Sequence, residues 1–376
     1  MDFALSEFQQ LLKEQAERFI ARDYGFEQRR SLITVTPGYS EAHWQTFAEL
    51  GWLGLPFSEE IGGFGGTAPD MALLFEVFGH GLVVEPYLAT VLGGLAVQHA
   101  GTAAQQQAIL PKVIAGDHKL ALASLEVGGR QAAPHVATIA KRVGGGWQLT
   151  GHKTVVLHGA SADTLVVSAR SHGAVDATGG IGLFLVPAGA PGVSRRGYAT
   201  VDGLRAAEVT LEQVELPDEA LLGDPVGGYG LLDSLLDLAG IAGCAEALGC
   251  MQALIDRTAE YLRTREQFGR KLGEFQVLQH ALVDMYMAAE QARSLTLAAA
   301  LNAEAAVPER QRLVAAARQF CADAGRLVGQ TAVQLHGGIG VTDELDVAHY
   351  FKRLTMLPQW FADHGQPLDR FMAAGG

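Results

Sequence analysis

A chain of 376 residues with 48% hydrophobic and 18% charged residues is long enough for two or three domains and too apolar to be disordered. Its net charge of −13 argues against a general nucleic-acid-binding protein. Three cysteines are too few for a disulfide framework, and no cysteine–histidine cluster has metal-ligand spacing. We therefore expect buried free thiols and no metal site.

The N-terminal segment MDFALSEFQQLLKEQ gives no targeting signal. It has neither the basic and apolar regions of a secretory signal nor the arginine- and serine-rich composition of a mitochondrial leader. The chain also lacks a window of 18 uninterrupted apolar residues, so we expect no membrane span and a cytoplasmic protein.

Residues 3 to about 116 are predicted to be helical. Apolar residues recur at helical spacing from Phe8 to Ala16, with Ser6 as a plausible N-cap. A second helix is predicted at His43–Leu50, and further helices follow at 71–79 and 89–100. The glycine-rich stretch between residues 51 and 66 lacks the Lys-Ser/Thr of a phosphate-binding loop, so we interpret it as a structural loop.

Short β-rich runs bounded by Gly, Pro, Asp and Ser replace the helical pattern from about residue 118 to 223. The predicted strands are Trp147–Gly151, Thr164–Ala169, Gly182–Val186 and Glu208–Leu211. Several short strands with such turns predict a small antiparallel barrel or sandwich.

Helical periodicity returns after about residue 226. The run Leu231–Cys250 is apolar almost all round, which predicts a buried or interface helix that continues to Arg263. The further predicted helices are Phe275–Ala300, Glu309–Leu335 and Leu345–Leu354. The order of elements predicts an α+β protein with a helical domain at 1–117, a β domain at 118–225 and a four-helix bundle at 226–376.

Two motifs in the C-terminal part carry the candidate chemistry. The first, YLRTREQFGRKLGEFQVLQHALVDMY from residue 261, crowds four cations beside two glycines, which suggests an anion site in so acidic a chain. A basic turn before a core helix is an equally good interpretation of the pattern alone. The second motif, QLHGGIG, begins at Gln334.

Together these motifs resemble the signatures of the acyl-CoA dehydrogenase family, and the resemblance extends over nearly the whole chain. It implies an FAD-dependent oxidation of an acyl-CoA thioester at its α and β carbons. It also implies that the FAD pyrophosphate and adenine are held by a neighbouring subunit. The residues that match this clamp, or lie beside it, are Arg265, Phe268, Phe275, Gln334, Gly337 and Gly338.

The half of the family pattern that contacts the flavin ring is altered. Leu125 and Gln131 stand where the family has threonine and serine, Val155 stands for its tryptophan, and Leu157 stands for a second threonine. Leucine side chains cannot donate hydrogen bonds to the ring. Backbone amides still can, so the resemblance implies weakened ring binding.

The glutamate base of the family is missing from both of its usual places. One position falls at Phe361 and the other at Ala239. Asp363 is a weak candidate base that requires the loop to shift, and Glu246 lies about two turns beyond Ala239 on the same helix face. For both carboxylates we expect a solvated or ion-paired role instead.

Three hypotheses follow from the resemblance. The first is a catalytically degenerate subunit of a heterotetramer, in which a second acyl-CoA dehydrogenase subunit supplies the ring pocket and base for an acyl-CoA such as a steroid side-chain thioester. The second is a self-sufficient homotetramer with Asp363 as base, and the third is a non-enzymatic scaffold or CoA-ester binder. In the enzymatic hypotheses an electron-transferring flavoprotein accepts the electrons by family resemblance.

Overall fold

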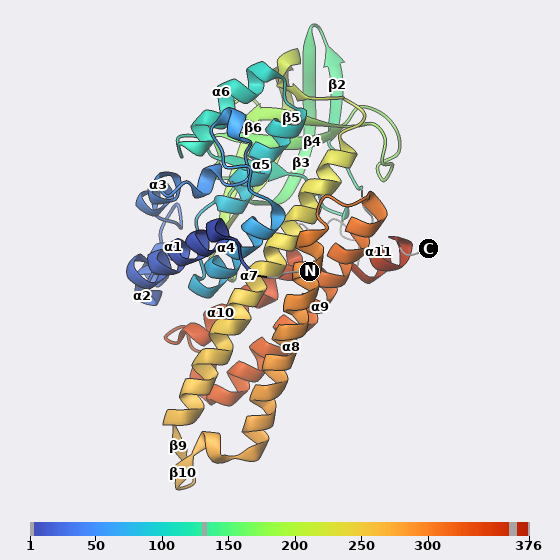
Figure 1. The fold of residues 1–376 in the computed structure, drawn as a ribbon. Helices are drawn as coiled ribbons and strands as arrows, with labels where there is room; N and C mark the ends of the chain where they lie inside the picture. Colours follow the sequence, from blue (N-terminus) through green and yellow to red (C-terminus); the bar gives the residue numbers. More distant parts are fainter. Residues whose placement is uncertain (1–3, 130–133, 361–366, 375–376) are drawn as a thin grey trace.

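A computed structural model describes residues 4–129, 134–360 and 367–374. Figure 1 shows three parts: a cluster of N-terminal helices, a β-sheet at one end, and long helices that extend away from the sheet to a small hairpin. This order of helices, strands and helices confirms the predicted fold class.

The N-terminal part packs its helices around an aromatic core. Ser6 caps the first helix as predicted, since its side chain accepts a hydrogen bond from the Gln9 backbone amide. Trp44, Phe47 and Trp52 are fully buried. The helices are α1 Glu7–Asp23, α2 Phe26–Ile33, α3 Glu41–Glu49, α4 Ala68–Gly81, α5 Tyr87–Ala100 and α6 Ala103–Ile114.

The glycine-rich segment between α3 and α4 is a structural loop, as the sequence predicted. Two 3₁₀ turns, Trp52–Gly54 and Glu59–Ile61, shape it. A Cβ on Gly63 would lie 2.1 Å from the backbone oxygen of Phe57, so this glycine is needed for close packing of the chain on itself.

The middle part is one sheet in the order β6-β7-β3-β2-β4-β5-β8, with β1 beside β4. The four predicted strands are present and longer than expected. The antiparallel prediction needs one correction, because β1 pairs with β4 in parallel and β2 meets β4 through one parallel pair. The strands are β1 Leu120–Ala123, β2 Ile139–Val143, β3 Gly146–Leu157, β4 Thr164–Arg170, β5 Ile181–Pro187, β6 Val193–Ala199, β7 Arg205–Pro217 and β8 Leu221–Leu222.

The C-terminal part is a bundle organised on α7, Tyr229–Thr264. This helix is long and apolar enough to cross a membrane, but 78% of its most apolar window is buried inside the fold, so it is a core helix as predicted. The predicted free thiols Cys244 and Cys250 on α7, and Cys321, are indeed buried and unbridged. The remaining helices are α8 Gln276–Leu301, α9 Val307–His336, α10 Asp346–Met356 and α11 Pro367–Ala374.

Helix α4 lies directly on α7, backbone against backbone. A Cβ on Gly79 would lie 2.0 Å from the Glu246 carbonyl oxygen, and one on Gly249 would lie 1.9 Å from that of Glu76. The Cys250 thiol donates to the Gly79 carbonyl oxygen at 3.3 Å. This reciprocal glycine contact fixes the N-terminal helices against the middle of α7.

Candidate active site and cofactor clamp

The basic motif forms a hairpin at the far end of the bundle from the sheet (Figure 1). Strands β9 Glu266–Gln267 and β10 Arg270–Lys271 pair across a tight turn. Both central residues of that turn, Phe268 and Gly269, have positive φ, at 56° and 76°. A left-handed phenylalanine is uncommon. Its ring lies edge-on to that of Phe275, with ring centroids 6.2 Å apart.

The two predicted clamp motifs meet at this end of the molecule. Tyr261, near the end of α7, stacks on His336, the last residue of α9, with ring centroids 4.5 Å apart. The backbone amide of Arg265 donates to the Tyr261 carbonyl oxygen at 2.9 Å. The structure therefore brings Arg265 close to the segment that carries Gln334, Gly337 and Gly338.

Several clamp residues are exposed to solvent, where core packing does not dictate which side chain is present. The Phe268 side chain is 89% exposed, and Arg265 and Gln334 are exposed as well. A Cβ on Gly338 would have nothing within 4 Å, and the backbone there has no positive φ. Glycine at this position therefore fits a close approach from outside the chain. Phe275 is half-buried and contacts the hairpin instead, with the Arg270 guanidinium 3.9 Å from the centre of its ring.

The two segments that match the family's flavin-ring contacts lie next to each other. Both pack against other parts of this chain. The Thr154 amide donates to the Leu125 carbonyl oxygen at 2.9 Å, and Val155 sits at φ 50° in a β-bulge. Leu157 and the following His158 are each only 5% exposed. The ring-side residue Gln131 lies outside the described residues.

Leu157 and His158 border a cavity of about 30 Å³ where the three parts of the chain meet. Glu85, Glu246 and Trp360 also line it. A space of this size holds about one water molecule, not an acyl group. Burial, with the charges of Arg353 and Arg205, lowers the pKa of His158 to about 3, so its ring is neutral.

A buried ion-pair network closes this junction. The Arg353 guanidinium contacts Glu246, and its Nε lies 2.8 Å from Asp202 Oδ2. All three side chains are at most 5% exposed. Burial raises the pKa of Glu246 to about 7 despite the Arg353 charge. The expectation that Glu246 is ion-paired is confirmed, and the closed cavity leaves no room for a substrate carbon beside it.

A second buried pair stabilises the β domain from within. Lys153 Nζ lies 2.6 Å from Glu126 Oε1, which also accepts the Thr138 hydroxyl at 2.6 Å. Burial alone would raise the pKa of Glu126, but the Lys153 charge and these hydrogen bonds lower it overall. The pair links the two ring-side segments without exposing either group to a ligand.

Comparisons with known proteins identify the family. Models of the N-terminal, middle and C-terminal domains of acyl-CoA dehydrogenases match residues 6–117, 121–214 and 227–360. This chain belongs to the acyl-CoA dehydrogenase family. The family uses FAD to oxidise acyl-CoA thioesters.

Some relatives match over almost their full length. The chain is 30% identical over 353 residues to a probable acyl-CoA dehydrogenase, YngJ, of Bacillus subtilis, covering 92% of each chain. In structure it resembles the ChsE4–ChsE5 complex of Mycobacterium tuberculosis (TM-score 0.88, 27% identity, 100% and 98% coverage). It also resembles a variant of the Tcur3481–Tcur3483 steroid acyl-CoA dehydrogenase (TM-score 0.87, 31% identity, 98% and 97% coverage).

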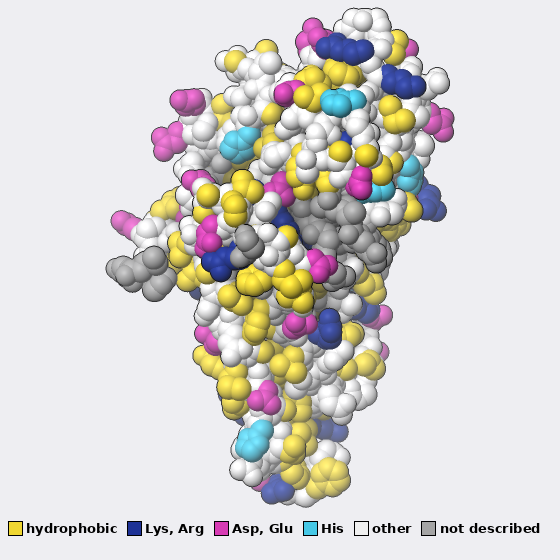
Figure 2. Space-filling model, turned by 90° about the vertical axis from the view of Figure 1, so that its right-hand side faces the viewer, with side chains coloured by type: hydrophobic (Ala, Val, Ile, Leu, Met, Phe, Trp, Pro, Cys, Tyr) yellow, Lys and Arg dark blue, Asp and Glu magenta, His cyan; other side chains and the backbone are white. Residues whose placement is uncertain are grey.

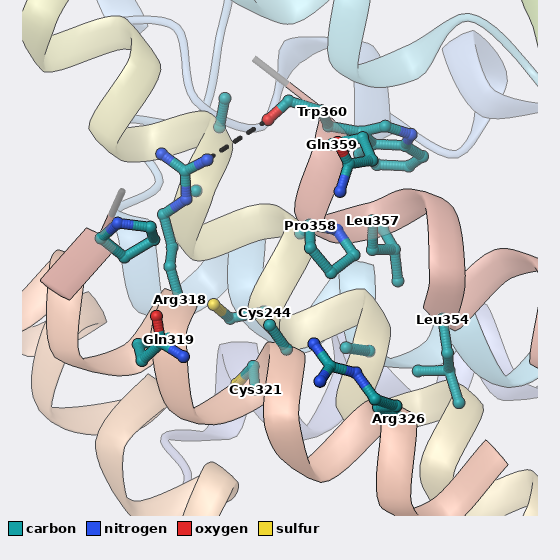
Figure 3. A pocket seen from close by; sticks show the side chains of 16 residues that line it. Cys244, Arg318, Gln319, Cys321, Arg326, Leu354, Leu357, Pro358, Gln359 and Trp360 are labelled. Atoms are coloured by element: carbon teal, nitrogen blue, oxygen red, sulfur yellow. Dashed lines mark hydrogen bonds between the residues drawn. The ribbon is translucent and has the colours of Figure 1, made fainter. Parts of the chain in front are cut away.

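Acyl-CoA dehydrogenases carry their glutamate base at one of two positions. In this chain one position has no carboxylate, and the other lies outside the described residues. Figure 3 shows a second pocket, between α7, α9 and the turn that follows α10. Ala239 is part of its lining and offers no carboxylate. Phe361 and the weak candidate Asp363 fall outside the described residues. Sequence reasoning missed Arg353 and Asp202, and no local signal could have identified them, because each finds its partner on a distant element.

Proposed function

We propose that this acyl-CoA dehydrogenase chain is the non-catalytic subunit of a hetero-oligomer. It holds the pyrophosphate and adenine of an FAD whose ring lies on a partner subunit, and the partner supplies the catalytic base. The chain's own cofactor-ring face takes no part in the reaction.

The observation that carries this proposal is the contrast between the two halves of the site. The clamp is open at the tip, whereas Leu157 and His158 are sealed against Glu246 in the same chain. Glu246 precedes Arg265 by 19 residues, which is roughly 28 Å of helix. A clamp that points away from its own ring face serves a flavin on a neighbouring subunit.

In this proposal Arg265 binds the pyrophosphate through forked, charge-assisted hydrogen bonds. Phe268 covers the dinucleotide, and the backbone at Gly337 and Gly338 approaches the adenine. When bound there, FAD would supply the acceptor for the hydride that leaves the β carbon of the substrate. This chain's residues orient the cofactor and exclude water from its adenine half.

An apolar surface on α8 supports an oligomer. Figure 2 shows hydrophobic side chains spread over the helical part of the chain that faces the viewer. The large hydrophobic side chains of α8 that are more than a third exposed are Val277, Val283, Tyr286, Met287, Leu297 and Leu301. So much exposed apolar surface on one helix is typical of a protein–protein interface.

The substrate and further partners follow from the same proposal. A bulky acyl-CoA, such as a steroid side-chain thioester, is favoured by the likeness to a steroid acyl-CoA dehydrogenase. The complex works in the cytoplasm and passes its electrons to an electron-transferring flavoprotein, as the family resemblance implies.

The test is the visible spectrum of the purified chain, alone and after co-expression with a second acyl-CoA dehydrogenase that retains the ring-side threonines and the glutamate base. We expect a colourless chain alone and a yellow complex with one FAD per heterodimer that bleaches anaerobically with acyl-CoA. Arg265→Gln in this chain should release FAD from the complex without dissociating the subunits.

Two outcomes would overturn the proposal. Stoichiometric FAD that bleaches in the chain alone would establish a self-sufficient enzyme, and Asp363→Ala would then test its base. A complex that never holds a reducible flavin would favour the scaffold hypothesis.

A further inference from the structure

An aromatic pair connects the last turn of α7 to the end of α9. The Tyr261 ring stacks on the His336 imidazole, with ring centroids 4.5 Å apart and 28° between the ring planes. The Tyr261 hydroxyl also donates to the His336 carbonyl oxygen at 3.4 Å. Tyr261 therefore contacts both the side chain and the backbone of the residue at which α9 ends.

Each member of this pair adjoins one half of the cofactor clamp. On the α7 side, the Tyr261 carbonyl oxygen accepts the backbone amide of Arg265 at 2.9 Å, and the Arg265 carbonyl oxygen accepts that of Leu272 at 2.9 Å. On the α9 side, the backbone turns directly after His336, at Gly337, whose φ of 68° and ψ of −148° favour glycine. A change in the stack would therefore move Arg265 relative to this turn.

His336 is placed to act through its neighbours and not as an anion ligand. Its side chain is only 5% exposed, and its Nδ1 lies 2.8 Å from the Ala332 carbonyl oxygen, so this nitrogen carries a proton and donates. Burial lowers the pKa of His336, so the imidazole is neutral at pH 7. A buried neutral ring offers no charge to a phosphate, whereas Arg265 is exposed and carries a permanent cation.

The separation of the two halves matters because one ligand has to contact both. Arg265 stands at the pyrophosphate position of the clamp, and the segment Gln334–Gly338 stands at the adenine position. A ligand that reaches two sites gains affinity only when the separation of the sites matches its own length. Pyrophosphate alone reaches only the first site and gains nothing from the match.

We propose that Tyr261 and His336 are positioning residues that fix the distance between the pyrophosphate and adenine halves of the clamp. This inference rests on the proposed function, in which both motifs hold one FAD. The stack forms within this chain, so the geometry of its half of the cofactor site does not require the partner subunit.

The test is a titration of the full purified chain with two probes, followed by ligand-observed NMR. One probe is adenosine diphosphate, which has the adenine and both phosphates of FAD, and the other is inorganic pyrophosphate. Tyr261→Leu and His336→Leu remove the stack and keep apolar bulk. We expect each to weaken adenosine diphosphate binding about two- to tenfold, the contribution of one aromatic pair, and to leave pyrophosphate binding unchanged. Tyr261→Phe and His336→Phe keep a ring and should restore most of the lost affinity.

Three further variants serve as controls. Leu327→Ala, on α9 with a side chain 44% exposed, should bind both probes like the native chain. Arg265→Gln should weaken both probes, because it removes the pyrophosphate ligand itself. His336→Gln keeps a donor for the Ala332 carbonyl oxygen without a ring, and it replaces His336→Leu if that variant does not fold. The Tm of each variant reports whether it is folded.

Three results would contradict the inference. Native affinity for adenosine diphosphate in both leucine variants, together with its loss in Arg265→Gln, would keep the clamp and remove the aromatic pair from it. Equal losses for both probes, not restored by phenylalanine, would show that the pair supports the fold only. No saturable binding of adenosine diphosphate to the native chain would overturn the clamp and the positioning role together.

Discussion

Glu246 and Arg353 form a buried ion pair across 107 residues of sequence. Each lies on a helix whose apolar pattern was predictable, and a charged residue in such a helix normally faces solvent. Their pairing needs the fold to bring α7 and α10 together, so it could not be predicted from sequence. Substitutions at named motif positions, such as Leu157, were in contrast visible from the sequence alone.

The raised pKa of Glu246 predicts a pH-dependent stability. Between its ordinary value of 4.5 and about 7, the folded chain holds a proton that the unfolded chain has released. Stability should therefore fall as pH rises through this window, by on the order of 3 kcal/mol at about 1.4 kcal/mol per pKa unit. Urea unfolding at pH 4.5 and 7.5 measures this change, and Glu246→Gln should flatten it. If the unfolding free energies of the native chain and of Glu246→Gln change equally with pH, Glu246 is not the group responsible.

At the level of elements, the sequence predicted long helices well and short strands poorly. Strand β1 is a run of four buried apolar residues, which no periodicity distinguishes from a buried helix. The β9–β10 hairpin was missed because phenylalanine holds a left-handed turn position where asparagine or glycine is usual. The Gly269 that follows Phe268 was the available signal.

The contact between α4 and α7 depends on glycine. Gly249→Ala places a methyl group against the Glu76 carbonyl oxygen, so we expect a loss of about 1–3 kcal/mol in unfolding free energy. Gly230→Ala, in the first turn of α7 with nothing within 4 Å, is the matched control. It should be neutral or stabilise the chain by about 0.5–1 kcal/mol. Equal effects of the two substitutions would show that the helix contact is not close.

Two glycines in the turn after α9 allow a cofactor role to be tested separately from a structural role. Gly338→Ala has open space around it, so it should leave Tm unchanged and reduce the FAD content of the co-expressed complex severalfold. Gly340→Ala would bring a methyl group to 2.9 Å from the Val333 carbonyl oxygen and should lower Tm. Calorimetry and flavin absorbance distinguish these effects. Full FAD retention with Gly338→Ala would remove this turn from the clamp.

For the molecule as a whole, one arginine joins the three parts. Arg29 on α2 donates to the carbonyl oxygens of Leu82 and Asp202, each at 2.8 Å, and its Nη1 lies 3.1 Å from His349 Nδ1 on α10. The order of the three domains could be predicted from periodicity and motifs. This connection could not, because nothing in the local sequence of α2 indicates partners so far along the chain.

Replacing Arg29 should make the unfolding of the three domains less cooperative. Arg29→Met leaves two buried carbonyl oxygens without this donor, so we expect a loss of about 3–5 kcal/mol and a lower Tm. Calorimetry should also show the single unfolding transition broadening or dividing. Arg30→Met, next to it but partly exposed and paired with Glu27, should change little. An unaltered, single transition in Arg29→Met would mean that apolar packing alone unites the domains.

The outward-facing hairpin has a consequence for how this protein evolves. If Arg265 and Phe268 serve a flavin held by another polypeptide, mutations at the tip harm the product of a different gene. Mutations at Leu157 or Ala239 that preserve the packing of the core harm neither product. Natural selection would then keep the tip constant while the former ring face drifts, and the two genes would have to be inherited together. Loss of one would leave the other encoding half of a cofactor site.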